Sequence, residues 1–90
     1  MAKGTYNIAG MRSSASKITT SMDIYKTNRE KINDVVKETN DYWDDPINKD
    51  YVQKFQNLKQ DMESVQNLMN AYADYLTKAA KVIEDETTVQ

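Results

Sequence analysis

The side chains best suited to chemistry lie together at the middle of the chain, where Asp44, Asp45, Asn48 and Asp50 follow one another closely. Their oxygen atoms are the ligands that a hard cation such as calcium takes. The stretch lacks the ligand spacing and the glycine of a calcium-binding loop, however, and adjacent acids before a helix are usually capping residues. We therefore predict no metal site and no cofactor.

The residue types on which most enzymes depend are missing. The chain has no histidine and no cysteine, so a nucleophile–base pair or a thiolate metal site cannot be assembled from it. Ser13, Ser14 and Ser16 have no basic partner that the pattern would bring near them. Gly4 and Gly10 lie near the N-terminus and form no glycine-rich phosphate loop. The sequence therefore predicts a protein that is not an enzyme.

Charge and hydropathy restrict the classes of partner that the protein is expected to bind. The net charge is −2 with both signs mixed along the chain, which argues against nucleic acid as a ligand because no basic run is present. No segment approaches the roughly 20 consecutive apolar residues that span a bilayer. The first residues lack the apolar core of a cleavable signal peptide, so we expect no membrane span and no general secretory route.

The single proline divides the chain into two helical segments. A helix that runs into Pro46 must stop or kink, and Asp45 is a good N-cap for a new helix that begins there. Asn7 is placed to cap the first helix. We predict one domain over residues 1–90, with a first helix at about 8–42, a turn at about 43–46 and a second helix at about 47–85. The acids in the tail at 86–90 and just before it oppose the helix macrodipole, so this end should fray.

Apolar residues recur in steps of three and four along both segments, which is the heptad pattern of packed helices. A short turn between two such helices makes them antiparallel neighbours. We predict that the stripe forms the core of the hairpin, with these members: Ile18, Met22, Tyr25, Ile32, Val36, Phe55, Leu58, Met62, Val65, Met69 and Tyr72.

A second set of apolar residues flanks this stripe, and a simple hairpin does not need it. A wider apolar face is typical of a helix in a four-helix bundle. The predicted fold is therefore all-α, an antiparallel two-helix hairpin that pairs into a four-helix bundle dimer with itself or with a related helical protein. A loose monomeric hairpin shielded by Tyr and Met is the alternative. The predicted dimer interface contains Ile24, Val35, Tyr42, Leu68 and Tyr75.

Trp43 is the only tryptophan, and it lies at the bend. As the last residue of the stripe it could close the end of the bundle. As a residue at an exposed turn it could dock on a partner, as Trp often does at interface hot spots. Both readings are compatible, because an indole can bury one face and present an edge.

Taken together, the chain resembles the WXG-motif family of type VII secretion, the small Esx or ESAT-like bacterial proteins. The resemblance covers nearly the whole length and rests on two helices, a lone Trp43 at the midpoint and an aromatic residue, Tyr51, eight positions later. The family motif Trp-x-Gly reads Trp43-Asp44-Asp45 here. The family's C-terminal signal, a Tyr followed four residues later by an acid, is not matched after Tyr72 or after Tyr75.

This resemblance implies a protein that acts by binding other proteins. It implies export without a cleavable signal peptide, from the cytoplasm to the outside, either as a secreted dimer or as a co-secreted adaptor or chaperone for a larger toxin or effector. It also assigns Trp43, Asp44 and Asp45 to contact with a partner or with the secretion machinery, including its ATPase. The alternative is a structural or regulatory coiled-coil hairpin that has no connection with secretion.

Overall fold

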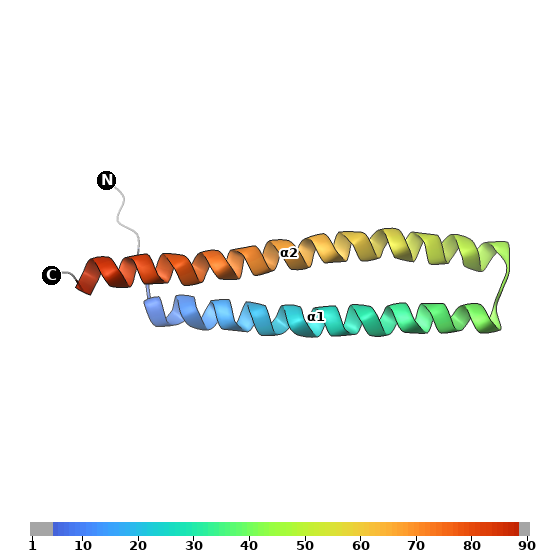
Figure 1. Cartoon of the computed structure of the whole chain (residues 1–90), viewed down its shortest axis with the longest axis horizontal. Coiled ribbons are helices and arrows are strands. Elements are labelled where there is room, and N and C mark those ends of the chain that lie inside the picture. The colour runs from blue at the N-terminus through green and yellow to red at the C-terminus, as the bar shows by residue number, and fades with distance from the viewer. Residues whose placement is uncertain (1–4, 89–90) are drawn as a thin grey trace.

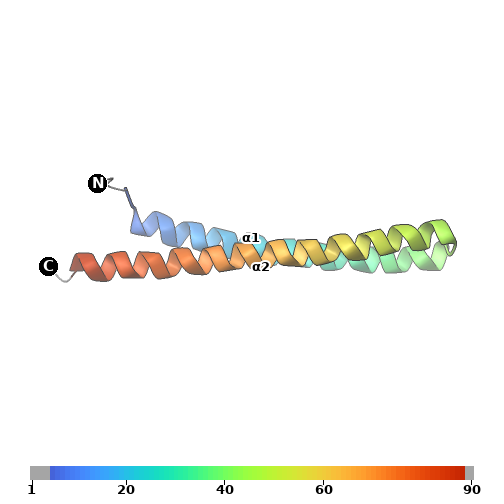
Figure 2. The ribbon, with the colours of Figure 1, turned by 90° about the horizontal axis from the view of Figure 1, so that it is seen from above.

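The computed structural model describes residues 5–88, which form two antiparallel helices joined by a short turn (Figure 1). Helix α1 comprises Ile8–Tyr42 and helix α2 comprises Pro46–Thr88, with no strand among the described residues. The helices cross at a shallow angle: in Figure 2, α1 lies above α2 near the termini and below it near the turn. The predicted all-α antiparallel hairpin is confirmed, whereas its pairing into a four-helix bundle stays a prediction.

Interactions between neighbouring residues determine both ends of helix α1. The side-chain oxygen of Asn7 accepts a hydrogen bond from the N–H of Gly10 at 2.9 Å, which satisfies one of the unpaired donors of the first turn. At the other end, Trp43 adopts an extended backbone with φ −143° and ψ 90°, which stops the helix. Its N–H still donates to the carbonyl of Thr39 at 2.9 Å. Helix α1 therefore starts at a side-chain cap and ends at an extended residue.

Helix α2 begins at Pro46, directly after Asp45, which caps it. The Oδ1 atom of Asp45 accepts from the N–H of Asn48 at 2.9 Å, and its carbonyl accepts from the N–H of Lys49 at 3.0 Å. No described non-glycine residue has a positive φ. This agrees with the extended backbone that Pro46 favours for the residue before it.

The C-terminal end of α2 differs from the prediction, since the helix continues to Thr88 instead of ending near residue 85. Two of the acids there, Glu84 and Asp85, are paired across the hairpin and along the helix. Both carboxylate oxygens of Glu84 accept from Arg12, at 2.8 and 3.1 Å, and Asp85 lies 3.5 Å from Lys81. These contacts offset the unfavourable macrodipole term. Residues 89–90 of the predicted tail lie outside the described residues.

The Arg12–Glu84 pair makes the open end of the hairpin sensitive to acid. The hydrogen bond from Arg12, together with its positive charge, lowers the pKa of Glu84 below its ordinary value. The stabilisation is therefore full above the pKa that Glu84 has in the unfolded chain, and it is lost as the pH falls through the lower folded value. We expect NMR titration of the Glu84 carboxyl carbon to give this low pKa, and Arg12→Gln to raise it. Lys26→Gln, which removes a charge elsewhere on α1, should leave the pKa of Glu84 unchanged. The same pKa of Glu84 in the wild type and both variants would contradict the pairing.

The molecule is too elongated to enclose a core of its own. Its radius of gyration is 20.2 Å, whereas a compact chain of this length would have about 12 Å. The described residues include no large side chain that is fully buried, and their buried apolar residues are all alanines: Ala15, Ala73 and Ala80. The larger apolar side chains are therefore half-buried or exposed in the single hairpin.

Candidate functional site

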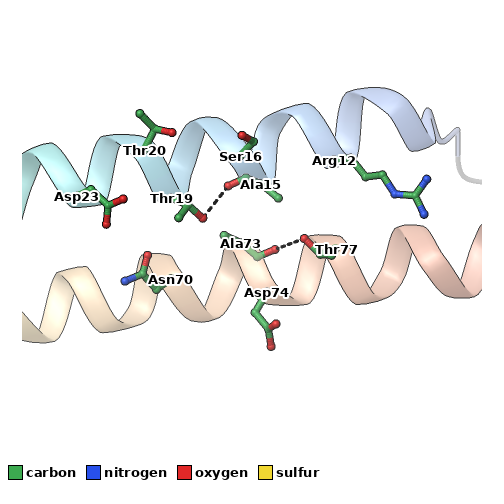
Figure 3. A pocket seen from close by; sticks show the side chains of 10 residues that line it. All are labelled: Arg12, Ala15, Ser16, Thr19, Thr20, Asp23, Asn70, Ala73, Asp74 and Thr77. Atoms are coloured by element: carbon green, nitrogen blue, oxygen red, sulfur yellow. Dashed lines mark hydrogen bonds between the residues drawn. The ribbon is translucent and has the colours of Figure 1, made fainter.

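The contact between α1 and α2 is made by small side chains near the open end. Ala15 and Ala73 are 5% and 4% exposed and lie across from each other in Figure 3. Thr19 and Thr77 beside them donate their hydroxyl hydrogens to the carbonyls of Ala15 and Ala73, at 3.0 and 3.1 Å. Both threonine hydroxyls therefore donate their hydrogen within their own helix and form no bond across the contact.

Polar side chains occupy the middle of the same contact. Arg29 is 5% exposed and donates from Nη1 to Oε1 of Gln66 at 2.6 Å, while its Nε has no hydrogen-bond partner. Next to it, Asn33 is 8% exposed and accepts from Nε2 of Gln56 at 3.3 Å. A buried cation held by one neutral acceptor contributes little to stability. The middle of the hairpin is therefore a polar layer instead of an apolar core.

The predicted hairpin core is accordingly displaced from the line between the helices. Seven of its residues are half-buried: Ile18, Met22, Tyr25, Val36, Phe55, Met62 and Met69. The other four differ from the prediction, because Ile32, Leu58, Val65 and Tyr72 are 47–54% exposed. The alanines and the polar layer hold the buried positions of the contact, whereas the large apolar side chains are half-buried or exposed.

The displaced residues gather on one side of the hairpin. Residues seven apart share a side of a helix, so Ile18 and Ile32 form a row on α1, while Leu58, Val65 and Tyr72 form one on α2. The two rows meet, because a groove between the helices has an apolar lining from both of them: Met11, Ile18, Tyr72 and Leu76. We call this side the apolar face, defined by its most central residues: Ile18, Ile32, Leu58, Val65 and Tyr72.

The predicted dimer-interface residues border the apolar face and are all exposed in the single chain. Ile24, Val35, Tyr42, Leu68 and Tyr75 have exposed fractions between 57% and 82%. Tyr72 and Tyr75 also stack on each other, with ring centroids 6.4 Å apart. These side chains add exposed apolar residues beside the apolar face, and exposed apolar patches often mark sites of protein binding.

The closed end of the hairpin holds Trp43, which is 44% exposed. Its indole Nε1–H donates to Oδ2 of Asp45 at 2.6 Å. Asp45 therefore uses one carboxylate oxygen for the cap of α2 and the other for the indole. The backbone N–H of Asn48 and the indole together lower the pKa of Asp45 below its ordinary value. Asp44, the third predicted contact residue, points to solvent and lies 3.6 Å from Lys49.

Asn48 is 5% exposed and forms hydrogen bonds that connect the two sides of the turn. Its Nδ2 donates to the carbonyl of Trp43 at 2.8 Å and to Oδ1 of Asn40 at 2.7 Å. These bonds tie the end of α1 to the start of α2, so the backbone of Trp43 is held on both sides. Sequence reasoning considered Asn48 only as a cation ligand, because nothing in the local pattern indicates a bond to a residue eight positions away.

Neither a metal site nor a membrane-spanning helix is found in the part of the chain that the structure describes. Over residues 5–88, no three or more acids come together in a way that could hold a metal ion. None of the described helices combines the length and the apolar composition that a bilayer crossing needs. The two surfaces described above are the apolar face and the tip, which consists of Trp43, Asp44 and Asp45.

Comparison with known proteins gives one match. The model of a protein family described as "WXG100: Proteins of 100 residues with WXG" matches residues 5–86. No curated protein and no solved structure matches the chain. The matched range includes all of α1, the turn, α2 up to residue 86 and every residue of the two surfaces described above.

Proposed function

Since the chain belongs to the WXG100 family of small helical proteins associated with type VII secretion, we propose that it acts by binding proteins through two surfaces. The apolar face pairs with a second helical hairpin, either a copy of the chain or a relative, to close a four-helix bundle. The tip around Trp43 contacts the secretion machinery, including its ATPase. The pair then leaves the cell, as a secreted dimer or as an adaptor that accompanies a larger effector.

The observation that carries the pairing is the position of the large apolar side chains. A self-sufficient hairpin would place them between its helices, but here that line is taken by Ala15, Ala73 and Arg29. Burying half of a Leu or Val side chain that is now exposed gains on the order of 1 kcal/mol. Each hairpin has several such residues, including Ile32, Leu58, Val65 and Tyr72. Their burial against a second apolar face would favour pairing.

The role of the tip is supported by the exposure of Trp43. A tryptophan that is 44% exposed and fixed at the end of a rigid hairpin can enter a pocket on a partner without a large loss of conformational freedom. An adaptor role is supported by the positions four residues after Tyr72 and Tyr75, where Leu76 and Ala79 stand in place of the acid of the Tyr-x-x-x-acid signal.

Trp43→Ala tests this proposal in the native host. We expect the variant to fold and to pair as the wild type does, while its amount in the culture medium falls by about tenfold or more, as for a hot-spot residue. Circular dichroism and light scattering check fold and pairing, and immunoblots of cells and medium measure export. Asp41→Ala, an exposed change at the same end, is the control and should be exported normally.

The outcomes separate this function from a purely structural hairpin. In that alternative Trp43 is only a packing residue, and its loss would lower stability by roughly 3–5 kcal/mol without a specific effect on export. Since nearly half of the residue is exposed, we expect a cost below about 2 kcal/mol. Normal export of a folded Trp43→Ala protein would show that the tip does not contact the machinery.

A further inference from the structure

The tip holds a feature that the proposed contact by Trp43 does not require: a carboxylate bonded to the indole. The position two residues after the tryptophan, where the family motif has glycine, is Asp45. Its Oδ2 accepts the indole N–H at 2.6 Å, and its Oδ1 accepts the N–H of Asn48 at 2.9 Å. A glycine could make neither bond. We propose that Asp45 is a positioning residue, which fixes the indole of Trp43 in the orientation that the partner recognises.

Two contacts hold Trp43 from opposite ends. The indole is held by Asp45, and the carbonyl of Trp43 accepts from Nδ2 of Asn48 at 2.8 Å. Asn48 is itself held, because it is 5% exposed and bonds to Asn40 as well. Since both holding residues belong to α2 or its cap, the start of α2 and the orientation of the indole are coupled.

The coupling follows from the two equivalent oxygens of a carboxylate. An ionised Asp side chain accepts hydrogen bonds at both oxygens, whereas an Asn side chain has one acceptor and one donor group. Only the acid can cap α2 and hold the indole at once. Asp45→Asn must therefore give up one of the two bonds, although it keeps the size of the side chain and remains a good N-cap.

An oriented indole matters because binding immobilises side chains. Ordering one flexible side chain at an interface costs about 0.5–1.5 kcal/mol, and a side chain that is already held avoids this cost. With a tenfold change for each 1.4 kcal/mol, the loss of the Asp45–indole bond should weaken the contact by about twofold to tenfold. This inference rests on the proposed function, in which Trp43 is the contact residue.

The only tryptophan gives one indole N–H signal in a nitrogen–proton NMR spectrum, and this signal is the direct probe. In Asp45→Asn we expect the indole signal to shift, its exchange with water to speed up and the fluorescence anisotropy of Trp43 to fall. The N–H signal of Asn48 reports separately whether the cap is kept. Asp41→Asn, which removes the same charge at the tip, should leave the indole signal in place. If both the indole signal and the N–H signal of Asn48 are unchanged in Asp45→Asn, the inference is overturned.

Export of the same variants from the native host is the second test of this inference. We expect Asp45→Asn to lower the amount in the medium by about twofold to tenfold, and to have no further effect when Trp43→Phe has already removed the indole N–H. If Trp43→Ala blocks export but Asp45→Asn is exported as the wild type, the positioning role is wrong and the proposed function stands. If Trp43→Ala is itself exported normally, the proposed tip contact fails, whatever the NMR arm shows.

Discussion

Leu58→Glu is expected to raise the dissociation constant of the four-helix pair by about a hundredfold or more, which is the cost of a central hot-spot change. Leu58 is 54% exposed in the single hairpin, so the charge is tolerated there. In the proposed pair the same position lies within the apolar face, where a carboxylate would be buried without a partner. The variant should therefore remain helical while losing its ability to pair.

Light scattering over a range of concentrations measures this change, either on the chain alone or with a co-purified related hairpin. Gln60→Glu is the matched control, because it adds the same charge two residues later, about 200° around α2 and away from the apolar face. Gln60 is exposed, so this variant should pair as the wild type does. Equal dissociation constants for the two variants would mean that the apolar face is not the interface.

Changes at the two ends of the Arg29–Gln66 bond are expected to have opposite effects on stability. Arg29→Met replaces a buried cation that has one acceptor and an unpaired Nε with an apolar side chain of similar length. Such replacements of buried charges are often stabilising, by about 1–4 kcal/mol. Gln66→Leu instead leaves the guanidinium buried without its acceptor, which costs on the order of 2–3 kcal/mol.

Urea unfolding followed by circular dichroism measures both changes, at one protein concentration because pairing contributes to apparent stability. The double variant should recover the stability of Arg29→Met, since no charge is then left unpaired. Gln53→Leu, at an exposed position of α2, is the control and should change stability by less than about 0.5 kcal/mol. A destabilised Arg29→Met would show instead that the polar layer contributes to the stability of the hairpin.

The sequence alone determined the two helices and their caps, because these depend on residues three or four positions apart. Asn7 reaches Gly10, and Asp45 reaches Asn48, within one turn of helix. Pro46 marks the start of α2 for an equally local reason, its missing N–H. The antiparallel arrangement also follows locally, because a connection of only three residues places the second helix beside the first and in the opposite direction.

Only the tertiary structure decided which side of each helix faces the other. The apolar stripe has the same period whichever of its edges is turned inward, so a modest rotation of both helices leaves the sequence pattern unchanged. That rotation puts Ala15 and Arg29 between the helices and leaves Leu58 and Val65 outside. The pairs Arg12–Glu84 and Arg29–Gln66 join residues 72 and 37 positions apart. Their partners are set by the register of the hairpin, which no local pattern contains.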